Sequence, residues 1–274
     1  MKYKQAELKS SQPYFVLESS DFRQSVYLQQ GISHFYSFRL EDAKEFANVP
    51  DGCVDLLFEY TEHEMRAFAC GTVMEYGKLH WEGEREIFGV RFLPGYPPAG
   101  LSTVPKELIN RRLLLDDILS DRTLIDRMAE ETAFESRMRV FLEEYTKLEN
   151  REDKPFGKAE VCMAVKDLIY ESYGTIRIQE LSEKTKYTER YINKVFIEYM
   201  GYSPKVFCKI IQFQRALEML NYREPENMTL LAQELGYYDQ PQFIRDFKKY
   251  AGITPNRYLK MIREKNFRER IQVV

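Results

Sequence analysis

The stretch Thr188-Glu-Arg-Tyr-Ile-Asn-Lys-Val-Phe196-Ile-Glu-Tyr-Met-Gly201-Tyr-Ser-Pro204 recurs 51 residues later as Asp239-Gln-Pro-Gln-Phe-Ile-Arg-Asp-Phe247-Lys-Lys-Tyr-Ala-Gly252-Ile-Thr-Pro255. A capping residue, an apolar residue, an aromatic, a glycine and a proline keep their places, as in two copies of one supersecondary unit. A short helix-forming segment precedes each copy, at 178–187 and at 229–238. A short helix, a tight turn and a capped second helix make a helix-turn-helix, so the repeat predicts two such units and points to DNA.

The C-terminal part of the chain predicts closely spaced helices. We expect them at 158–172, 178–185, 188–200, 204–221, 228–235, 240–250 and 255–267. The helix from Pro204 to Leu220 joins the two units, and at ~1.5 Å per residue it is about 25 Å long. That length can seat the flanking units roughly one turn of DNA apart on one face of a duplex.

The second helix of each unit has apolar positions at helical spacing, so the polar side chains between them should face outward. Arginine can chelate guanine, asparagine can chelate adenine, and lysine can hold guanine or phosphate. The predicted DNA-binding residues are Thr188, Arg190, Asn193, Lys194, Gln240, Gln242, Arg245, Lys248 and Lys249. Thr188 is also the expected helix cap, and the two adjacent lysines, past the helix midpoint, should hold phosphates. The alternative is a solvated polar face on each helix; the equivalent places in a duplicated unit favour DNA.

Residues 160–262 resemble the C-terminal DNA-binding domain of the AraC/XylS family of bacterial transcription regulators. The likeness rests on Tyr187-Thr-Glu-Arg-Tyr-Ile-Asn-Lys-Val-Phe196, Gly201-Tyr-Ser-Pro204, Phe213-Gln-Arg-Ala-Leu-Glu-Met-Leu220, Leu235-Gly-Tyr-Tyr-Asp-Gln-Pro-Gln-Phe-Ile-Arg-Asp-Phe-Lys-Lys-Tyr250 and Gly252-Ile-Thr-Pro255, in family order. The resemblance implies that DNA is read by Arg190, Asn193 and Lys194 in the first unit and by Gln240, Gln242 and Arg245 in the second. Pro241 departs from the family pattern, because a proline fits a first helical turn but cannot hydrogen-bond a base edge.

The first hundred residues predict short strands. The aromatic and β-branched runs are Tyr14–Leu17, Ile32–Phe38, Cys53–Tyr60, Met65–Cys70 and Glu86–Phe92, separated by Gly, Pro, Asp and Asn. Strands this short and regularly spaced favour a small barrel or sandwich with room for one ligand. After Pro105 the apolar period changes to 3.6, which predicts an amphipathic helical stretch.

The expected fold class is therefore α+β, in two domains. Residues 1–150 should form a β-rich effector-binding or dimerisation domain with helices from about 106. Residues 158–274 should form an all-α domain with two helix-turn-helix units. The boundary falls in the charged segment 147–158, which Pro155 and Gly157 interrupt.

The N-terminal half also resembles, more loosely and over roughly residues 10–120, a domain found in a subset of AraC-type regulators. The similar segments are Pro50-Asp-Gly-Cys-Val-Asp-Leu-Leu-Phe58, Gly89-Val-Arg-Phe-Leu-Pro-Gly95 and Val104-Pro-Lys-Glu-Leu108, and they imply a sensor role. From the residues alone, a mixed aromatic and polar ligand pocket could be lined by Asp55, Phe58, Tyr60, Trp81 and Arg91. The alternative is that Asp55 and Arg91 form a strand-end ion pair and that the aromatics are core.

Composition narrows the function classes. From Lys158 to Val274 the chain has 20 Lys and Arg against 15 Asp and Glu, while the remainder has 20 against 28. A basic half joined to an acidic half suggests a nucleic-acid-binding module attached to another domain. With no apolar signal core or membrane-length run, we expect a cytoplasmic protein.

Motifs for chemistry are missing from the sequence. The four cysteines lack C-x-x-C spacing and the three histidines lack H-x-H or H-x-x-x-H spacing, so we predict no metal and no cofactor. Neither a Pro-Cys-His thiol site nor a four-cysteine zinc site is present, although DNA-repair methyltransferases can carry this kind of DNA-binding module. We therefore predict a protein that is not an enzyme.

The favoured function is a DNA-binding transcription regulator that responds to a small-molecule effector. The alternatives are a regulator controlled by a protein partner, and a DNA-repair enzyme. The expected partners are double-stranded DNA, RNA polymerase, a small molecule and a second copy of the chain. The stretch 108–148 has more apolar positions than one helix face needs, which favours a homodimer interface there. The alternative is a monomer in which this stretch only covers the β-rich fold and packs against the DNA-binding domain.

Overall fold

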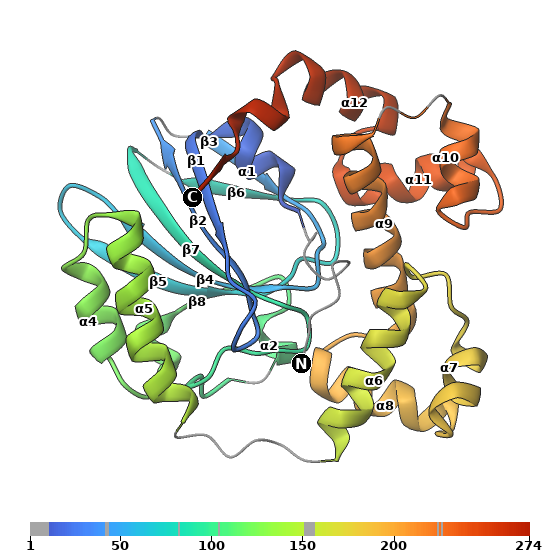
Figure 1. The fold of residues 1–274 in the computed structure, drawn as a ribbon, viewed down its shortest axis with the longest axis horizontal. Coiled ribbons are helices and arrows are strands. Elements are labelled where there is room, and N and C mark those ends of the chain that lie inside the picture. Colours follow the sequence, from blue (N-terminus) through green and yellow to red (C-terminus); the bar gives the residue numbers. More distant parts are fainter. Residues whose placement is uncertain are drawn as a thin grey trace.

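The computed structural model joins a β-rich N-terminal half to a C-terminal half made of helices (Figure 1). It describes residues 11–41, 44–81, 83–103, 105–150, 157–223, 225 and 227–274. A seven-stranded sheet has the order β8-β5-β4-β7-β2-β1-β9, and β3 and β6 form a separate pair. The strands are β1 Ser20–Val26, β2 Ile32–Leu40, β3 Lys44–Asn48, β4 Val54–Tyr60, β5 Met65–Cys70, β6 Gly77–Trp81, β7 Arg85–Phe92, β8 Arg112–Leu114 and β9 Gln272–Val273.

The helices of the N-terminal half cover this sheet, and those of the C-terminal half follow the predicted succession. The first set is α1 Pro13–Glu18, α2 Pro105–Leu108, α3 Leu115–Ile118, α4 Thr123–Ala129 and α5 Phe134–Glu149. The second set is α6 Lys158–Glu171, α7 Ile178–Thr185, α8 Glu189–Met200, α9 Pro204–Tyr222, α10 Met228–Glu234, α11 Gln240–Ala251 and α12 Pro255–Glu264, followed by the 3-10 turn η2 Phe267–Arg270.

The α+β fold class is confirmed, but the first strand expected from the sequence is wrong. Tyr14–Leu17 lies within α1, where Pro13 occupies the first helical turn. A proline there preorganises the backbone for a helix, and the four apolar residues after it are all buried. The predicted domain boundary cannot be followed through residues 151–156, which lie outside the described part of the chain.

Both faces of the seven-stranded sheet are covered. Successive side chains of a strand point to opposite faces, so Phe58 and Phe88 pack in the cluster under α4 and α5. Leu57 and Ile87, one position along each strand, pack in the cluster on the other face. On that second face, the β3–β6 pair packs across the sheet, as in a sandwich.

The amphipathic stretch 108–148 covers the sheet of its own chain. Leu124, Met128, Phe141 and Tyr145 are buried in one cluster with the sheet residue Phe35. The ring centroids of Phe35 and Phe141 are 5.8 Å apart. The excess of apolar positions that favoured a dimer interface is therefore accounted for within one chain.

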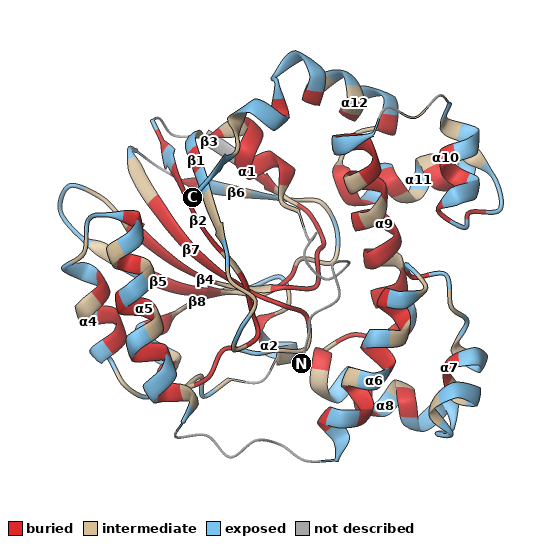
Figure 2. Ribbon diagram, in the orientation of Figure 1, coloured by how far each residue is buried: buried red, intermediate tan, exposed pale blue. Residues whose placement is uncertain are grey.

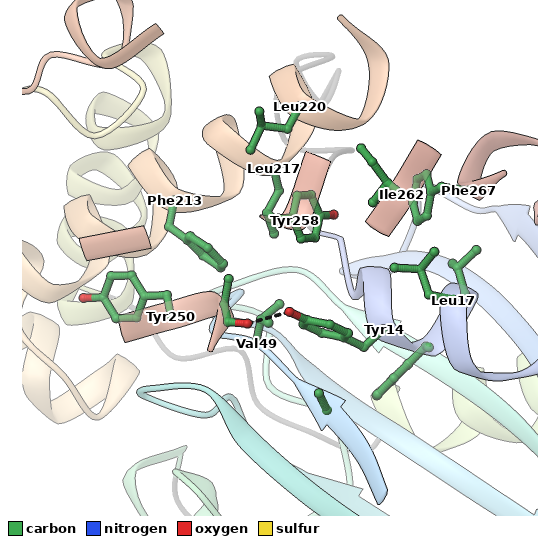
Figure 3. Close-up of a cluster of buried hydrophobic side chains, with 14 of the residues drawn as sticks. Tyr14, Leu17, Val49, Phe213, Leu217, Leu220, Tyr250, Tyr258, Ile262 and Phe267 are labelled. Atoms are coloured by element: carbon green, nitrogen blue, oxygen red, sulfur yellow. Dashed lines mark hydrogen bonds between the residues drawn. The ribbon is translucent and has the colours of Figure 1, made fainter. Parts of the chain in front are cut away.

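The two halves share a hydrophobic cluster, shown in Figure 3. Tyr14 and Leu17 of α1 lie in it with Leu217 of α9 and Tyr258 of α12. The Tyr14 hydroxyl donates a hydrogen bond to the carbonyl oxygen of Ala251 at 2.5 Å. Figure 2 shows buried residues along α1 and along most of α9. The helical half is thus packed against the sheet half over part of its own core.

The C-terminal end of the chain returns to the N-terminal sheet. Strand β9 pairs in parallel with β1, and the backbone N–H of Val274 donates to the carbonyl oxygen of Gln24 at 2.9 Å. The guanidinium of Arg270 donates to the carbonyl oxygens of Val16 and Ser19. This two-residue strand had no signal of its own in the sequence.

A buried amide on α9 fastens the two halves together. The side chain of Gln214 accepts from the backbone N–H of Ser11 at 2.7 Å and donates to the carbonyl oxygen of Pro50 at 2.7 Å. Gln214 is buried, and Pro50 is buried with it. A buried peptide group left without its partner costs about 1–3 kcal/mol, so this amide is a specific attachment between the halves.

We expect Gln214→Leu to loosen the halves from each other. The substitution keeps the side-chain volume but leaves the Pro50 carbonyl and the Ser11 N–H without their side-chain partner, which should lower the free energy of unfolding by about 1–3 kcal/mol. The matched control is Gln212→Leu, because buried Gln212 donates to Leu235 within the helical half. Denaturant unfolding followed by separate probes in the two halves should split into two transitions for Gln214→Leu only. A single shared transition in both variants would contradict the assignment.

Candidate nucleic-acid interface

The two helix-turn-helix units are built by the same local chemistry. Thr188 caps α8 by accepting from the N–H of Tyr191 at 3.3 Å, and Asp239 caps α11 by accepting from the N–H of Gln242 at 2.7 Å. Each helix ends at a glycine in the left-handed conformation, Gly201 with φ +87° and Gly252 with φ +75°. A glycine adopts this conformation at little steric cost. The repeat seen in the sequence is therefore a repeat of helix starts and ends.

The inward faces of the two second helices are buried as their spacing predicts. Ile192 and Phe196 of α8 pack in the cluster of the first unit, and Phe243 and Phe247 of α11 pack in that of the second. Helix α9 runs between the units (Figure 1) and contributes to both clusters. Its 19 residues make it about 28 Å long, close to the expected length.

The outward face of α8 carries the predicted residues. Arg190 and Lys194 are exposed, and Asn193 is half-buried. The Asn193 amide donates to the carbonyl oxygen of Glu189 at 2.9 Å in its own helix. Asn193 must therefore give up this bond to chelate an adenine, whereas Arg190 and Lys194 already extend into solvent.

The predicted DNA-binding residues of α11 differ in exposure and in the contacts that they already make. Arg245 and Lys248 are exposed, while Gln240 accepts from the hydroxyl of Thr229 in α10 at 2.7 Å. Gln242 is half-buried in the first turn. Lys249 pairs with Glu75 of the N-terminal half at 3.0 Å.

Two exposed tyrosines were missed by the sequence reasoning. Tyr187 and Tyr238 stand immediately before the caps of α8 and α11, at equivalent places in the repeat. Tyr238 is 94% exposed and Tyr187 is 44% exposed, with its ring 5.2 Å from that of Tyr191. The repeat could have revealed them, because an aromatic side chain with no place in a core is unusual beside a helix cap.

The N-terminal half touches both second helices at their C-terminal ends. A Cβ atom at Gly201 would lie 2.5 Å from Ile109 and 2.8 Å from the backbone of Lys106. A Cβ atom at Gly252 would lie 2.8 Å from the ring of Tyr76. The N-terminal half thus holds equivalent points of the two units, away from the helix starts that carry the predicted base-reading residues.

The two adjacent lysines of α11 allow a matched test of phosphate contact. Each phosphate neutralised by a protein cation changes the slope of log K against log salt by about 1. We expect Lys248→Gln to reduce the slope for DNA binding by about 1. Lys249→Gln should reduce it less, because Glu75 already balances the charge of Lys249. Equal effects, measured by fluorescence anisotropy over a salt series, would contradict this difference.

In the N-terminal half, the structure brings together only two of the five predicted ligand residues. Arg91 binds Asp55 through two hydrogen bonds, of 2.8 Å and 2.7 Å, and lies 3.3 Å from a carboxylate oxygen of Asp51. Arg91 is buried beneath the helical half, on the face of the sheet away from α4 and α5. The ion pair is the alternative that the sequence had left open.

The other three predicted ligand residues are occupied elsewhere. Phe58 is buried against α5, with its ring 6.2 Å from that of Phe141. The Tyr60 hydroxyl donates to the carbonyl oxygen of Met128, and the Trp81 indole donates to the carboxylate of Glu59. The five residues therefore do not surround one pocket, because Phe58 and Tyr60 alternate with Asp55 onto the opposite face.

A cavity of about 240 Å³ lies beside Arg91, between the sheet and the helical half. His34, Tyr36 and Arg91 line it from β2 and β7, and Asn221 and Phe267 line it from the helical half. Burial, with the nearby Arg91 guanidinium, lowers the pKa of His34 to about 3. His34 is therefore neutral near pH 7.

The neutral His34 should make stability depend on pH. Its pKa is lowered by folding from about 6.5, so the unfolded chain takes up a proton first as pH falls, and stability drops below about pH 6.5. This histidine should account for up to about 2 kcal/mol of lost stability between pH 7 and pH 5. Urea unfolding of His34→Gln should show that much less pH dependence. The exposed His63→Gln is the matched control, and equal pH profiles for wild type and His34→Gln would contradict a neutral His34.

The cysteine surroundings do not favour thiol chemistry. Burial raises the pKa of Cys70 and of Cys162 to about 12, and that of Cys208 to about 11. A thiol is nucleophilic as the thiolate, so these three groups are poor nucleophiles at neutral pH. Over the described ranges, no group of three or more His, Cys, Asp or Glu side chains is placed to hold a metal ion. Nor does any helix in those ranges have the length and apolar content needed to cross a membrane.

Two family descriptions match the chain. Residues 181–261 match a helix-turn-helix domain, and residues 22–113 match a domain of unknown function, DUF6597. The first range begins within α7 and contains the rest of both units together with α9. The second range contains most of the strands of the seven-stranded sheet.

The matched relatives are regulators by description. An uncharacterised HTH-type transcriptional regulator of Haemophilus influenzae is 26% identical over 31% of this chain and 28% of the relative. The Msm operon regulatory protein of Streptococcus mutans is 25% identical over 36% of this chain and 35% of the relative. The matches thus span about a third of the length of these relatives. Among solved structures, ToxT from Vibrio cholerae is similar at a TM-score of 0.46 and 12% identity, over 83% of this chain and 97% of that one.

Proposed function

The chain carries an AraC-type helix-turn-helix domain together with a DUF6597 domain, and from this premise we propose that it is a sequence-specific, DNA-binding transcription regulator. Helices α8 and α11 enter two successive major grooves of one duplex. Arg190, Asn193 and Lys194 read the first groove, and Arg245 is the main reader in the second. The N-terminal half controls how these two helices are presented.

The observation that carries this proposal is the matched register of the two units. Lys194 of α8 and Arg245 of α11 lie 51 residues apart, at the same position of the repeat, and both are exposed cations on the outward faces of their helices. Arg190 lies one turn earlier on α8, where α11 has Pro241. Contact of arginine or lysine with guanine is the commonest specific contact of a recognition helix in the major groove. A single helix with such a face is common. Two such helices, joined by a helix nearly as long as one turn of DNA, can bind two successive major grooves.

The second unit reads with fewer groups than the first. Pro241 occupies its first turn and offers no hydrogen-bond donor, and Gln240 is held by Thr229 at 2.7 Å. Tyr238 stands fully in solvent beside this turn. We assign to it a contact with a phosphate through its hydroxyl or with a thymine methyl through its ring.

The proposal includes a small-molecule effector and the recruitment of RNA polymerase. The effector is supported by the cavity between the halves and by the attachment of both units to the N-terminal half. We also propose RNA polymerase and a second copy of the chain as partners. Sedimentation of the full chain at micromolar concentration tests whether two copies of the chain associate.

The proposal is tested by sequence selection on DNA. Wild-type protein should enrich a motif with two half-sites about one helical turn apart from a random duplex pool. On the enriched sequence, Arg190→Ala should cost about 1–3 kcal/mol and relax preference at one base pair, with little loss on random DNA. The control is Arg122→Ala, since Arg122 is an exposed arginine of the N-terminal half. Equal losses on both DNAs would reassign Arg190 to phosphate, and no enriched motif from wild type would overturn the proposed function.

A further inference from the structure

We propose that the cavity between the sheet and the helical half binds an uncharged aromatic molecule that carries a hydrogen-bond acceptor. This names the effector site and its ligand class, and its regulatory consequence rests on the proposed function. The cavity lies between segments far apart in the sequence: α1, β1 and β2 on one side, and the end of α9 and η2 on the other. Its volume of about 240 Å³ exceeds that of a cavity known to admit benzene, about 150 Å³.

Five aromatic rings form part of the cavity wall, beside polar side chains. Phe15, Phe22 and Tyr36 contribute from the N-terminal half, and Tyr222 and Phe267 from the helical half. The rings of Phe22 and Tyr36 lie 6.3 Å apart and nearly parallel. Flat aromatic walls favour a flat ligand, because stacked and edge-on ring contacts add to the burial of apolar surface.

The amide of Asn221 is a buried donor at the cavity without an acceptor in the described part of the chain. The Asn221 side chain is 2% exposed, and its carbonyl oxygen accepts from the Tyr258 hydroxyl at 2.7 Å. Its amide nitrogen finds no hydrogen-bond partner among the described residues. A buried N–H without an acceptor is costly. An acceptor atom on a ligand would satisfy it, since Asn221 borders the cavity.

The charges at the cavity favour an uncharged ligand. Arg91 is held by two hydrogen bonds to Asp55 and lies beside Asp51, so a bound anion would find the guanidinium already opposed by two carboxylates. Glu218 is held by Arg215 at 2.5 Å. A charged ligand would lose its hydration here without gaining a counter-charge, which is strongly unfavourable in a buried site.

A ligand in this cavity contacts the element that places the second unit. Asn221 lies on the last turn of α9, and the Tyr258 hydroxyl bonded to it belongs to α12. Four and eight residues earlier on α9, Leu217 and Phe213 are buried in the cluster that holds α11, as Figure 3 shows for their side chains. Occupation of the cavity therefore stabilises one arrangement of α9 and α12 against the sheet. We infer that the ligand thereby changes affinity for DNA, in which case DNA changes affinity for the ligand by the same factor.

The experiment uses three molecules of one size and different charge. They are 2-naphthamide, which is neutral with a carbonyl acceptor, 2-naphthoate, which is an anion, and 2-naphthylmethylamine, which is a cation near neutral pH. Titration of the full chain by ligand-observed NMR should show the amide binding at least tenfold more tightly than either charged compound. Equal binding of the three compounds would overturn the ligand class, and no binding of the amide would overturn the site. Neither result would bear on sequence-specific DNA binding.

Two variants locate the binding. Val26→Trp places a large side chain at the cavity from a position that is 54% exposed, so the fold should tolerate it and the amide should bind at least tenfold more weakly. Val206→Trp, at a partly exposed position on α9 outside the cavity, should bind it as wild type does. Asn221→Asp keeps the acceptor for Tyr258 and removes the donor, and should weaken amide binding. An unchanged affinity in Val26→Trp would overturn the location.

The coupling is measured on the DNA selected by the wild-type chain. Saturating 2-naphthamide should change its dissociation constant by at least fivefold in one direction, and the DNA should change amide affinity by the same factor. If the amide binds and DNA affinity changes less than twofold, the regulatory consequence is overturned. If the chain selects no DNA sequence, the proposed function fails while amide binding still tests the cavity.

Discussion

Helix α9 is the constraint on which the arrangement of this molecule depends. Its buried amide, Gln214, is bonded to the backbone of the N-terminal half. Phe207, near its start, packs in the first helix-turn-helix unit, and Phe213 and Leu217 pack in the second. Since a helix of this length behaves as a stiff rod, the three bodies it touches cannot move independently. Because α9 packs against all three bodies, most of its residues are buried.

The contacts of the N-terminal half with the two units are equivalent as well as separate. Ile109 reaches the glycine that ends α8, and Tyr76 reaches the glycine that ends α11. A residue with a side chain at either glycine would meet the N-terminal half as well as an unfavourable φ angle. The second contact is reinforced by Lys249 and Glu75, a surface ion pair of small energy. The N-terminal half therefore contacts α8 and α11 at their C-terminal ends and leaves their outward faces open.

The sequence predicted the elements that depend on local signals. It did not predict the elements whose structure depends on contacts with distant segments of the chain. The helices of the C-terminal half begin and end close to the predicted residues, because caps such as Thr188 and Asp239 and glycine ends are local signals. Strand β9 was not foreseen, since two residues acquire strand structure only by pairing with β1. Tyr14–Leu17 was assigned to a strand because four apolar residues fit either state, and the burial that made it a helix comes from the other half of the chain.

The same division holds for the candidate sites. Exposed residues such as Arg190 could be predicted, because the period of one helix is enough to tell its outward face. The predicted ligand pocket mixed Phe58 with Arg91, although the parity of β4 and β7 places them on opposite faces of one sheet. Asn221, nearly two hundred residues from His34, could not be associated with it by any local pattern. A cavity made where two halves meet depends on their relative position, and for that reason it is also sensitive to a change in that position. The outward face of a helix can be recognised from that helix alone, whereas a cavity between the two halves becomes visible only in the folded chain.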